Sequence, residues 1–328
     1  NFLPLNVIFW SESTCEKKCQ CMLDTHTVIC QSENCSADEI CQPVSWYHMC
    51  QPILSAYCQV LGGQHYTTFD GQRYHFQGDC TYVLSQVCAP SHNQSLTYYQ
   101  LEAKVQGTAS DAPRIEYLRM IVYGQDIVLM TNSTGHVMIG GIKTLLPVVL
   151  LGGKIQMRKS GFSVKLDTDF GVTFSYTGNH HVEIGVPARY QNATCGLCGT
   201  LNENPSDDFS TPNGSLVESV TLFVRSWQVK NVEDHCGDIR QPTTCPLTKL
   251  ANYSSSEYCG VLEKSPGPFA DCAQMVPVSS LMEVCLNDVC TAGGNQTVLC
   301  NLLHIYAEHC QSANITVGQW REQTQCGE

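Results

Sequence analysis

Short runs in the middle of the chain alternate between apolar and polar residues. Each run is rich in β-branched or aromatic side chains, and together they cover residues 96–105, 115–123, 126–130, 136–139, 154–157, 162–166, 172–176 and 181–184. Turn-forming pairs separate many of them, at Gly124-Gln125, Thr134-Gly135, Gly152-Gly153, Ser160-Gly161 and Gly178-Asn179. Alternation with period two marks a half-buried strand, and short turns join antiparallel neighbours. The pattern therefore predicts a mainly β protein with antiparallel strands packed as a β-sandwich.

The pattern changes after Cys245. Within residues 297–310, apolar side chains recur at helical spacing, namely Val298, Leu299, Leu302, Leu303 and Tyr306. Residues 281–285 have the character of a second short helix, and 266–268 form a loop. Eight cysteines between Cys245 and Cys326 are enough for four bridges. The pattern predicts a small α-helical eight-cysteine domain over residues 241–328.

The first 57 residues are polar and hold seven of the cysteines. A domain this small buries too little apolar surface to be stable alone, so bridges must compensate. Zinc is the alternative for such spacing, but this stretch lacks a Cys/His ligand quartet. We therefore predict three domains: 1–57, small and disulfide-rich; 58–240, the β-sandwich; and 241–328, the helical domain. Because seven is odd, we expect one of these cysteines to pair upstream of Asn1 or with another molecule, as in a longer repeat array.

The cysteines also indicate the compartment. Twenty-one of them in 328 residues point to an oxidising environment and a disulfide framework. N-x-S/T sequons, the acceptor sites for N-linked sugars, are present at Asn34, Asn93, Asn132, Asn192, Asn213, Asn252, Asn295 and Asn314. At Asn34, bridge formation by Cys35 competes with sugar addition. The combination predicts a secreted, extracellular glycoprotein.

Charge and hydropathy exclude some partners. The formal net charge of −12 argues against nucleic acid and against anionic membranes, because both attract a basic face. The most apolar stretch, residues 139–155, is interrupted by Gly140-Gly141, Lys143 and Pro147. We therefore expect no membrane insertion by this fragment. No signal peptide opens the sequence, so we expect any such segment to lie outside it.

One short loop concentrates candidate chemistry. Cys195-Gly-Leu-Cys198 runs into a stretch dense in side-chain oxygens, those of Thr200, Asn202, Glu203, Asn204, Ser206, Asp207 and Asp208. Hard divalent cations such as calcium prefer several oxygens from one short loop, whereas transition metals prefer imidazole or thiolate. Asn, Asp, Pro and Ser are also ordinary turn formers. From the loop alone, a calcium site and a solvated acidic turn are equally compatible with the sequence.

Two separated motifs, taken together, resemble a known family. The run 66–84, Tyr-Thr-Thr-Phe-Asp-Gly-Gln-Arg-Tyr-His-Phe-Gln-Gly-Asp-Cys-Thr-Tyr-Val-Leu, followed by Cys195-Gly-Leu-Cys-Gly199 and Asp207-Asp208, resembles a von Willebrand factor type D domain. The segment from Cys245 to Cys326 is similar to the eight-cysteine domain that follows it in that family. Residues 1–57, with Phe9-Trp10 ahead of Cys15, resemble the small domain that precedes such modules. The resemblance covers nearly the whole chain.

The resemblance implies specific pairings and a cation. The bridges would be Cys58–Cys198, Cys80–Cys236 and Cys88–Cys195, and calcium would be bound by Asp70, Asn202, Asn204, Asp207 and Asp208. Two departures from the family pattern matter. Gly62-Gly-Gln-His65 replaces a Gly-Asp-Pro-His run whose acid-labile Asp-Pro bond can self-cleave, so we expect no such cleavage. Thr200 stands where the family usually has Asn, so we expect weaker calcium binding.

Catalytic interpretations find little support. A redox Cys-x-x-Cys pair sits at a helix N-terminus, whereas Cys195 and Cys198 follow a strand pattern and precede an acidic loop. There is no Gly-x-Ser-x-Gly or His-Glu-x-x-His motif, and His180-His181 lie on a predicted strand without an evident carboxylate partner. We therefore expect a non-catalytic structural or adhesion module whose partners are other modules of the same array and extracellular glycoproteins, with homo-oligomers also compatible. The alternative is a disulfide-exchanging module that uses Cys195 and Cys198 for intermolecular links.

Overall fold

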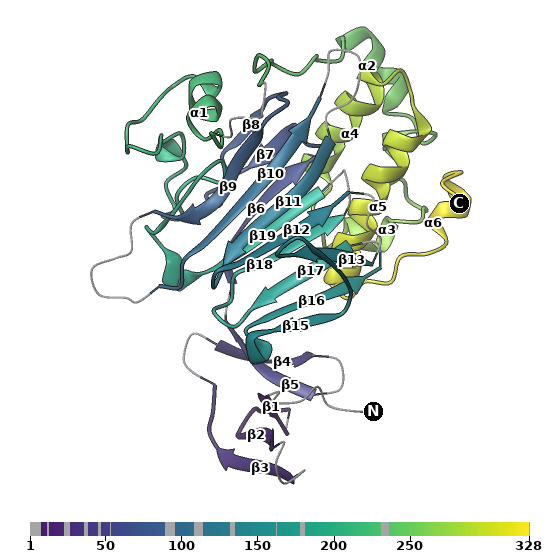
Figure 1. Ribbon diagram of the computed structural model, residues 1–328. Coiled ribbons are helices and arrows are strands. Elements are labelled where there is room, and N and C mark those ends of the chain that lie inside the picture. The colour runs from purple at the N-terminus through teal and green to yellow at the C-terminus, as the bar shows by residue number, and fades with distance from the viewer. Residues whose placement is uncertain are drawn as a thin grey trace.

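The computed structural model describes residues 8–11, 13–22, 27–35, 39–44, 47–52, 54–88, 96–107, 114–131, 135–161, 163–177, 181–230 and 236–327. Within these residues the chain forms a small N-terminal sheet, two larger antiparallel sheets and a helical C-terminal part (Figure 1). The chain is mainly β, with small Cys-rich and helical parts at its two ends, as the sequence predicts.

The N-terminal sheet has five strands in the order β3-β2-β1-β5-β4. Their bounds are β1 Ile8–Trp10, β2 Lys17–Met22, β3 Thr27–Ser32, β4 Glu39–Val44 and β5 Tyr47–Pro52. The small core of this part centres on Trp10, Cys15 and Cys50. Three bridges, Cys15–Cys41, Cys19–Cys30 and Cys35–Cys50, hold it together. With so little apolar surface buried, the bridges are the main constraint on this part.

The two larger sheets form the middle of the molecule. The eight-stranded sheet has the order β15-β16-β17-β18-β19-β6-β7-β8, and the seven-stranded sheet has the order β14-β13-β12-β11-β10-β9-β20. The bounds of the first are β6 Leu54–Leu61, β7 His65–Thr67, β8 Arg73–His75, β15 Val148–Leu150, β16 Ile155–Ser160, β17 Ser163–Thr168, β18 Thr173–Thr177 and β19 His181–Pro187. Those of the second are β9 Thr81–Val87, β10 Tyr99–Gln106, β11 Arg114–Val122, β12 Gln125–Met130, β13 His136–Ile139, β14 Ile142–Leu145 and β20 Thr194–Cys195.

The inner faces of the two sheets share one apolar core. Leu101 of β10 and Leu118 of β11 belong to the same buried cluster as Leu166 of β17 and Ile184 of β19. Strands β10–β13 and β16–β19 overlap the eight predicted runs, with ends that differ by up to a few residues. Predicted turn glycines such as Gly124 and Gly161 have positive φ angles of 72° and 61°, which glycine adopts most readily. The predicted turn at Gly178-Asn179 lies outside the described residues.

The helical part follows Cys245. It contains α2 Leu247–Tyr253, α3 Ala270–Ala273, α4 Ser279–Thr291, α5 Gln296–Ser312 and α6 Trp320–Gln323, whereas α1 Val220–Ser226 packs with the sandwich. The predicted helical stretches 281–285 and 297–310 fall inside α4 and α5. Bridges Cys245–Cys290, Cys259–Cys285, Cys272–Cys310 and Cys300–Cys326 cross-link this part. Figure 1 shows α4 and α5 lying alongside the eight-stranded sheet.

Candidate metal site

The acidic loop, which we define as residues 200–208, and Asp70 meet at one end of the sandwich. Asp70 lies in the turn between β7 and β8, where the Phe69 N–H donates to the Cys198 carbonyl at 3.0 Å. The bridges Cys58–Cys198 and Cys88–Cys195 tie the start of the loop to β6 and to the end of β9. As a result, one carboxylate oxygen from each of Asp70, Asp207 and Asp208 lies within 4.8 Å of the others.

The amides of Asn202 and Asn204 are also drawn into this cluster. Their backbone N–H groups donate to the Asp70 carboxylate at 3.0–3.2 Å. Their side-chain nitrogens donate to Asp207 Oδ2 at 2.8 and 2.9 Å. In this arrangement the nitrogen of each side-chain amide faces Asp207. Rotation of the amide group about the Cβ–Cγ bond would place its oxygen there instead, as cation binding requires. The structure thus brings together all five predicted ligand residues.

Asp208 is the most enclosed member of the cluster, with 1% of its surface exposed. It accepts hydrogen bonds from the Thr68 hydroxyl at 2.6 Å and from the Thr200 N–H at 3.0 Å. Burial, together with the charges of Asp70 and Asp207, raises the pKa of Asp208 to about 7. Asp207 Oδ1 is buried and has no hydrogen-bond partner among the described residues. The donors described here are a hydroxyl, backbone N–H groups and side-chain amides, which are all neutral and do not offset the negative charge of the carboxylates.

A glycine makes this close approach feasible. Gly199 has a φ of +72°, and a Cβ there would collide with the Asp208 carboxylate. A side chain at this position would therefore suffer both an unfavourable backbone conformation and displacement of Asp208. Among the described residues, Thr200 contacts the carboxylates through its backbone N–H, which donates to Asp208, and not through its side chain. The donor set, carboxylate and amide oxygens without imidazole or thiolate, is the one that hard cations prefer.

The bridges that the resemblance implies are all present: Cys58–Cys198, Cys80–Cys236 and Cys88–Cys195. Cys195 and Cys198 are therefore bonded to different partners, not to each other. Cys198 is also fully buried. This arrangement is that of two structural bridges leading into one loop.

The sequon asparagines that the structure describes all lie at the surface: Asn34, Asn192, Asn213, Asn252, Asn295 and Asn314. Asn93 and Asn132 lie outside the described residues. Asn295 has a structural role as well, because its side chain caps α5 by accepting the Thr297 N–H at 2.9 Å.

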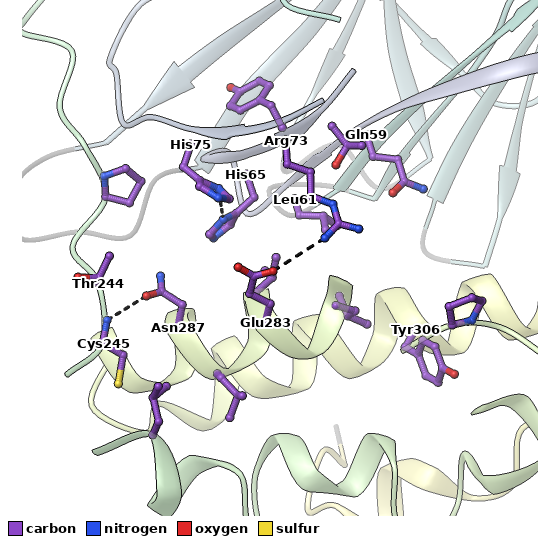
Figure 2. Close-up of a pocket in the computed structure, with 18 of the residues that line it drawn as sticks. Gln59, Leu61, His65, Arg73, His75, Thr244, Cys245, Glu283, Asn287 and Tyr306 are labelled. Atoms are coloured by element: carbon purple, nitrogen blue, oxygen red, sulfur yellow. Dashed lines mark hydrogen bonds and ion pairs between the residues drawn. The ribbon is translucent and has the colours of Figure 1, made fainter. Parts of the chain in front are cut away.

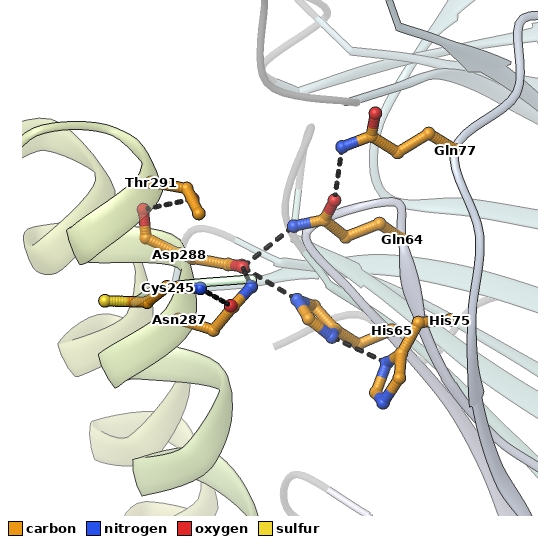
Figure 3. Close-up of polar contacts among 8 residues, drawn as sticks. All are labelled: Gln64, His65, His75, Gln77, Cys245, Asn287, Asp288 and Thr291. Atoms are coloured by element: carbon orange, nitrogen blue, oxygen red, sulfur yellow. Dashed lines mark hydrogen bonds and ion pairs between the residues drawn. The ribbon is translucent and has the colours of Figure 1, made fainter. Parts of the chain in front are cut away.

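A buried polar network joins the sandwich to the helical part (Figure 3). Asp288 of α4 accepts from Gln64 Nε2 at 2.8 Å, and the same oxygen lies 2.8 Å from His65 Nε2. Gln77 Nε2 in turn donates to Gln64 Oε1 at 2.9 Å. A Cβ on Gly62 would lie only 3.2 Å from Asp288 Oδ2. The run Gly62–His65, noted in the sequence only as a departure from the cleavage motif, thus forms part of an interdomain contact.

Next to this network, a cavity of about 560 Å³ separates β6–β8 from α4 and α5. Figure 2 shows Arg73 and His75 on the strand side, facing Glu283 and Asn287 of α4. Arg73 Nη1 lies 3.9 Å from Glu283 Oε2, and both side chains are largely exposed. The sequence gives no sign of this cavity, because its two walls come from different domains.

Two known protein families match the segments that form the sandwich and the helical part. The family model of the von Willebrand factor type D domain matches residues 58–215, and that of the C8 domain matches residues 258–327. The chain thus belongs to the von Willebrand factor type D family. In this chain the type D sandwich is followed by a C8 domain. Among the described residues, we find no helix with an apolar stretch of the length that a bilayer span requires.

Individual relatives match over nearly the whole chain. Mouse alpha-tectorin is 36% identical over 328 residues, which cover 99% of this chain and 15% of the relative. Human IgGFc-binding protein is 32% identical over 340 residues, 99% of this chain and 6% of the relative. Human zonadhesin is 31% identical over 319 residues, 97% of this chain and 11% of the relative. The chain thus spans only a small part of the length of each.

Proposed function

We propose that this chain is a non-catalytic, calcium-binding structural and adhesion module of a secreted or cell-surface glycoprotein, such as a component of extracellular matrix, mucus or a cell coat. The observation that carries the proposal is the cluster of Asp70, Asp207 and Asp208, whose carboxylate oxygens lie within 4.8 Å of one another. Asp207 has a buried oxygen without a partner among the described residues. Three carboxylates this close repel one another unless a cation neutralises them.

Asp70 and Asp207 would each offer a carboxylate oxygen to calcium, and Asp208 would do so after losing its proton. Asn202 and Asn204 would add amide or carbonyl oxygens. Extracellular modules use sites of modest affinity, with dissociation constants of roughly 10⁻⁴–10⁻³ M, which suits a loop with Thr200 in place of Asn. When bound, calcium would supply the positive charge that holds the loop against Asp70.

The disulfide framework supports the structural part of the proposal. Ten bridges among the described residues stiffen the N-terminal, sandwich and helical parts. A rigid unit with exposed sequons suits repeated use in an extracellular array, where its partners would be neighbouring modules and other glycoproteins. The disulfide-exchange alternative has less support, because Cys195 and Cys198 take part in separate bridges.

The test is thermal melting in calcium and in chelator, using the wild-type chain, Asp208→Asn and Glu203→Gln. Glu203 is an exposed carboxylate of the same loop outside the cluster, so its variant controls for the loss of one negative charge. We expect calcium to raise the melting temperature of the wild type and of Glu203→Gln, since an ion that binds only the folded state stabilises it. Asp208→Asn should lose most of this response. Equal melting of the wild-type chain in calcium and chelator would leave only a solvated acidic turn.

A further inference from the structure

A second cluster of potential ligands lies where α5 crosses the outer face of the eight-stranded sheet. A cavity of about 330 Å³ is lined there by residues of both the sandwich and the C8 domain. Its side chains include His181 and Glu183 of β19 and His309 of α5. One ligand atom from each of these three residues lies within 4.8 Å of the other two.

The local structure explains why these side chains meet. Residues two apart on a strand point to the same face, so His181 and Glu183 share the outer face. Val182 and Ile184, on the opposite face, are fully buried in the sandwich core. Helix α5 is held at this position by Glu308. Its carboxylate accepts hydrogen bonds from the Ser163 hydroxyl at 2.5 Å and from the Thr177 hydroxyl at 3.0 Å. His309 is the next residue along α5. The carboxylate of Glu183 thus lies near His181, for which the sequence offers no evident carboxylate partner.

Each of the two imidazoles has a buried ring nitrogen without a hydrogen-bond partner among the described residues. His181 is 3% exposed, and its Nε2 is buried without a hydrogen-bond partner among the described residues. His309 Nε2 is in the same situation, and the two rings lie edge to face with centroids 5.4 Å apart. Buried side-chain nitrogens are nearly always paired, so two unpaired ones in one cluster require an explanation. Burial lowers the pKa of both rings, so both are neutral at neutral pH and can offer a lone pair.

We propose that His181, Glu183 and His309 bind a transition-metal ion of the Zn²⁺ type, which links the sandwich to the C8 domain. Two imidazoles and one carboxylate form a common three-residue zinc set, and the cavity leaves room for water as a fourth ligand. Calcium is disfavoured because it requires a shell of oxygens. Gln59 Nε2 donates to Glu183 Oε2 at 3.0 Å, a contact of the kind that orients a metal-binding carboxylate. The site shares no residue with the acidic loop.

The test uses the full chain with calcium present throughout, and Zn²⁺ alone as the probe. Calorimetric titration should show one Zn²⁺ per chain, and Zn²⁺ should raise the melting temperature. His309→Gln and Glu183→Gln should each weaken binding by at least about tenfold, the scale seen even for residues that only orient a ligand. The matched control is His136→Gln, since His136 lies on β13 of the other sheet, and it should bind as the wild type does.

A second measurement needs no variant at all. In the folded wild-type chain, side-chain NMR of the imidazole nitrogens should show two histidines shifting together on addition of one equivalent of Zn²⁺. The proposal is overturned if no Zn²⁺ binds in calcium, or if other histidines shift instead. It is also overturned if folded His309→Gln binds as tightly as the His136→Gln control.

Discussion

At the scale of single residues, the raised pKa of Asp208 should make the stability of the folded chain depend on pH when no divalent cation is present. Its pKa of about 7 in the folded chain lies above the 3.8 of an ordinary aspartate. The folded state therefore binds more protons than the unfolded state between these two values, and stability rises as the pH falls through 7. We expect the melting temperature in chelator to increase from pH 8 to pH 6.5. We limit the range to pH 6.5 because burial lowers the pKa of His181 and His309 in the folded chain. At lower pH these histidines take up protons more readily in the unfolded chain, which reduces the stability of the fold.

Asp208→Asn isolates this effect, since an amide carries no charge at any pH. The variant should melt at a similar temperature at pH 8 and pH 6.5 in chelator, and above the wild type at pH 8. Calcium should reverse the wild-type trend, because a proton on Asp208 competes with the ion. A wild-type melting temperature that falls from pH 8 to pH 6.5 in chelator, in parallel with the variant, would contradict the raised pKa.

At the scale of secondary-structure elements, the packing of α5 on the sandwich depends on Glu308. Although burial acts to raise it, the pKa of Glu308 falls to about 2 because His304, Ser163 and Thr177 stabilise the carboxylate. Glu308→Ala leaves the Ser163 and Thr177 hydroxyls without this acceptor, which should lower the free energy of unfolding by about 1–3 kcal/mol. Because the folded pKa is depressed, this stabilisation is present above about pH 4.5 and is lost as the pH falls toward 2.

The matched control for Glu308→Ala is Glu283→Ala. Glu283 also faces the sandwich from the C8 domain, but its pairing with Arg73 is long and exposed. Exposed pairs contribute little, so this variant should change stability by less than about 1 kcal/mol. Urea unfolding followed by circular dichroism measures both. Equal effects of the two substitutions would show that Glu308 has no special role in holding α5.

The same scale shows what the sequence can and cannot reveal. Strands with one face in the core, such as β11 with Leu118 and Met120 buried, show the period-two pattern. The sequence does not reveal β9, because nearly all of Thr81–Val87 is buried and no alternation appears. Strands β7 and β8 are three residues each, too short for a pattern.

The candidate site residues also divide into those that the sequence reveals and those that it does not. The oxygens of the acidic loop are adjacent in sequence and can be recognised directly. Asp70 is found only through the family resemblance, because it comes from a distant turn. The His181, Glu183 and His309 cluster combines two domains, and neither domain alone signals it.

At the scale of the whole molecule, the sandwich and the C8 domain form one docked unit. Asp288 reaches from α4 to Gln64 and His65, while Glu308 reaches from α5 to Ser163 and Thr177. These contacts lie at separate places along the interface, which restrains both translation and rotation of the helices. The N-terminal part has its own small core and its own three bridges. Its remaining cysteine is therefore the candidate for a covalent link to something else.

That cysteine is Cys21. The ten bridges among the described residues use twenty of the twenty-one cysteines and do not include Cys21 of β2. Each bridge also joins two cysteines of the same part of the chain, so an odd number is left in residues 1–57, as the count in the sequence predicts. We expect non-reducing peptide mapping of the isolated chain to find Cys21 alkylated, or joined to a cysteine of another molecule.

The control for this prediction is Cys21→Ser, which should keep all ten bridges and melt at the wild-type temperature. In a longer chain, the same mapping should join Cys21 to a cysteine outside these 328 residues, because a lone thiol in an oxidising compartment tends to be oxidised to a disulfide. A peptide that joins Cys21 to one of the other twenty cysteines would contradict the prediction, as would an alkylated cysteine in the sandwich. Either result would mean that the N-terminal part is cross-linked to the rest of the chain in a different way.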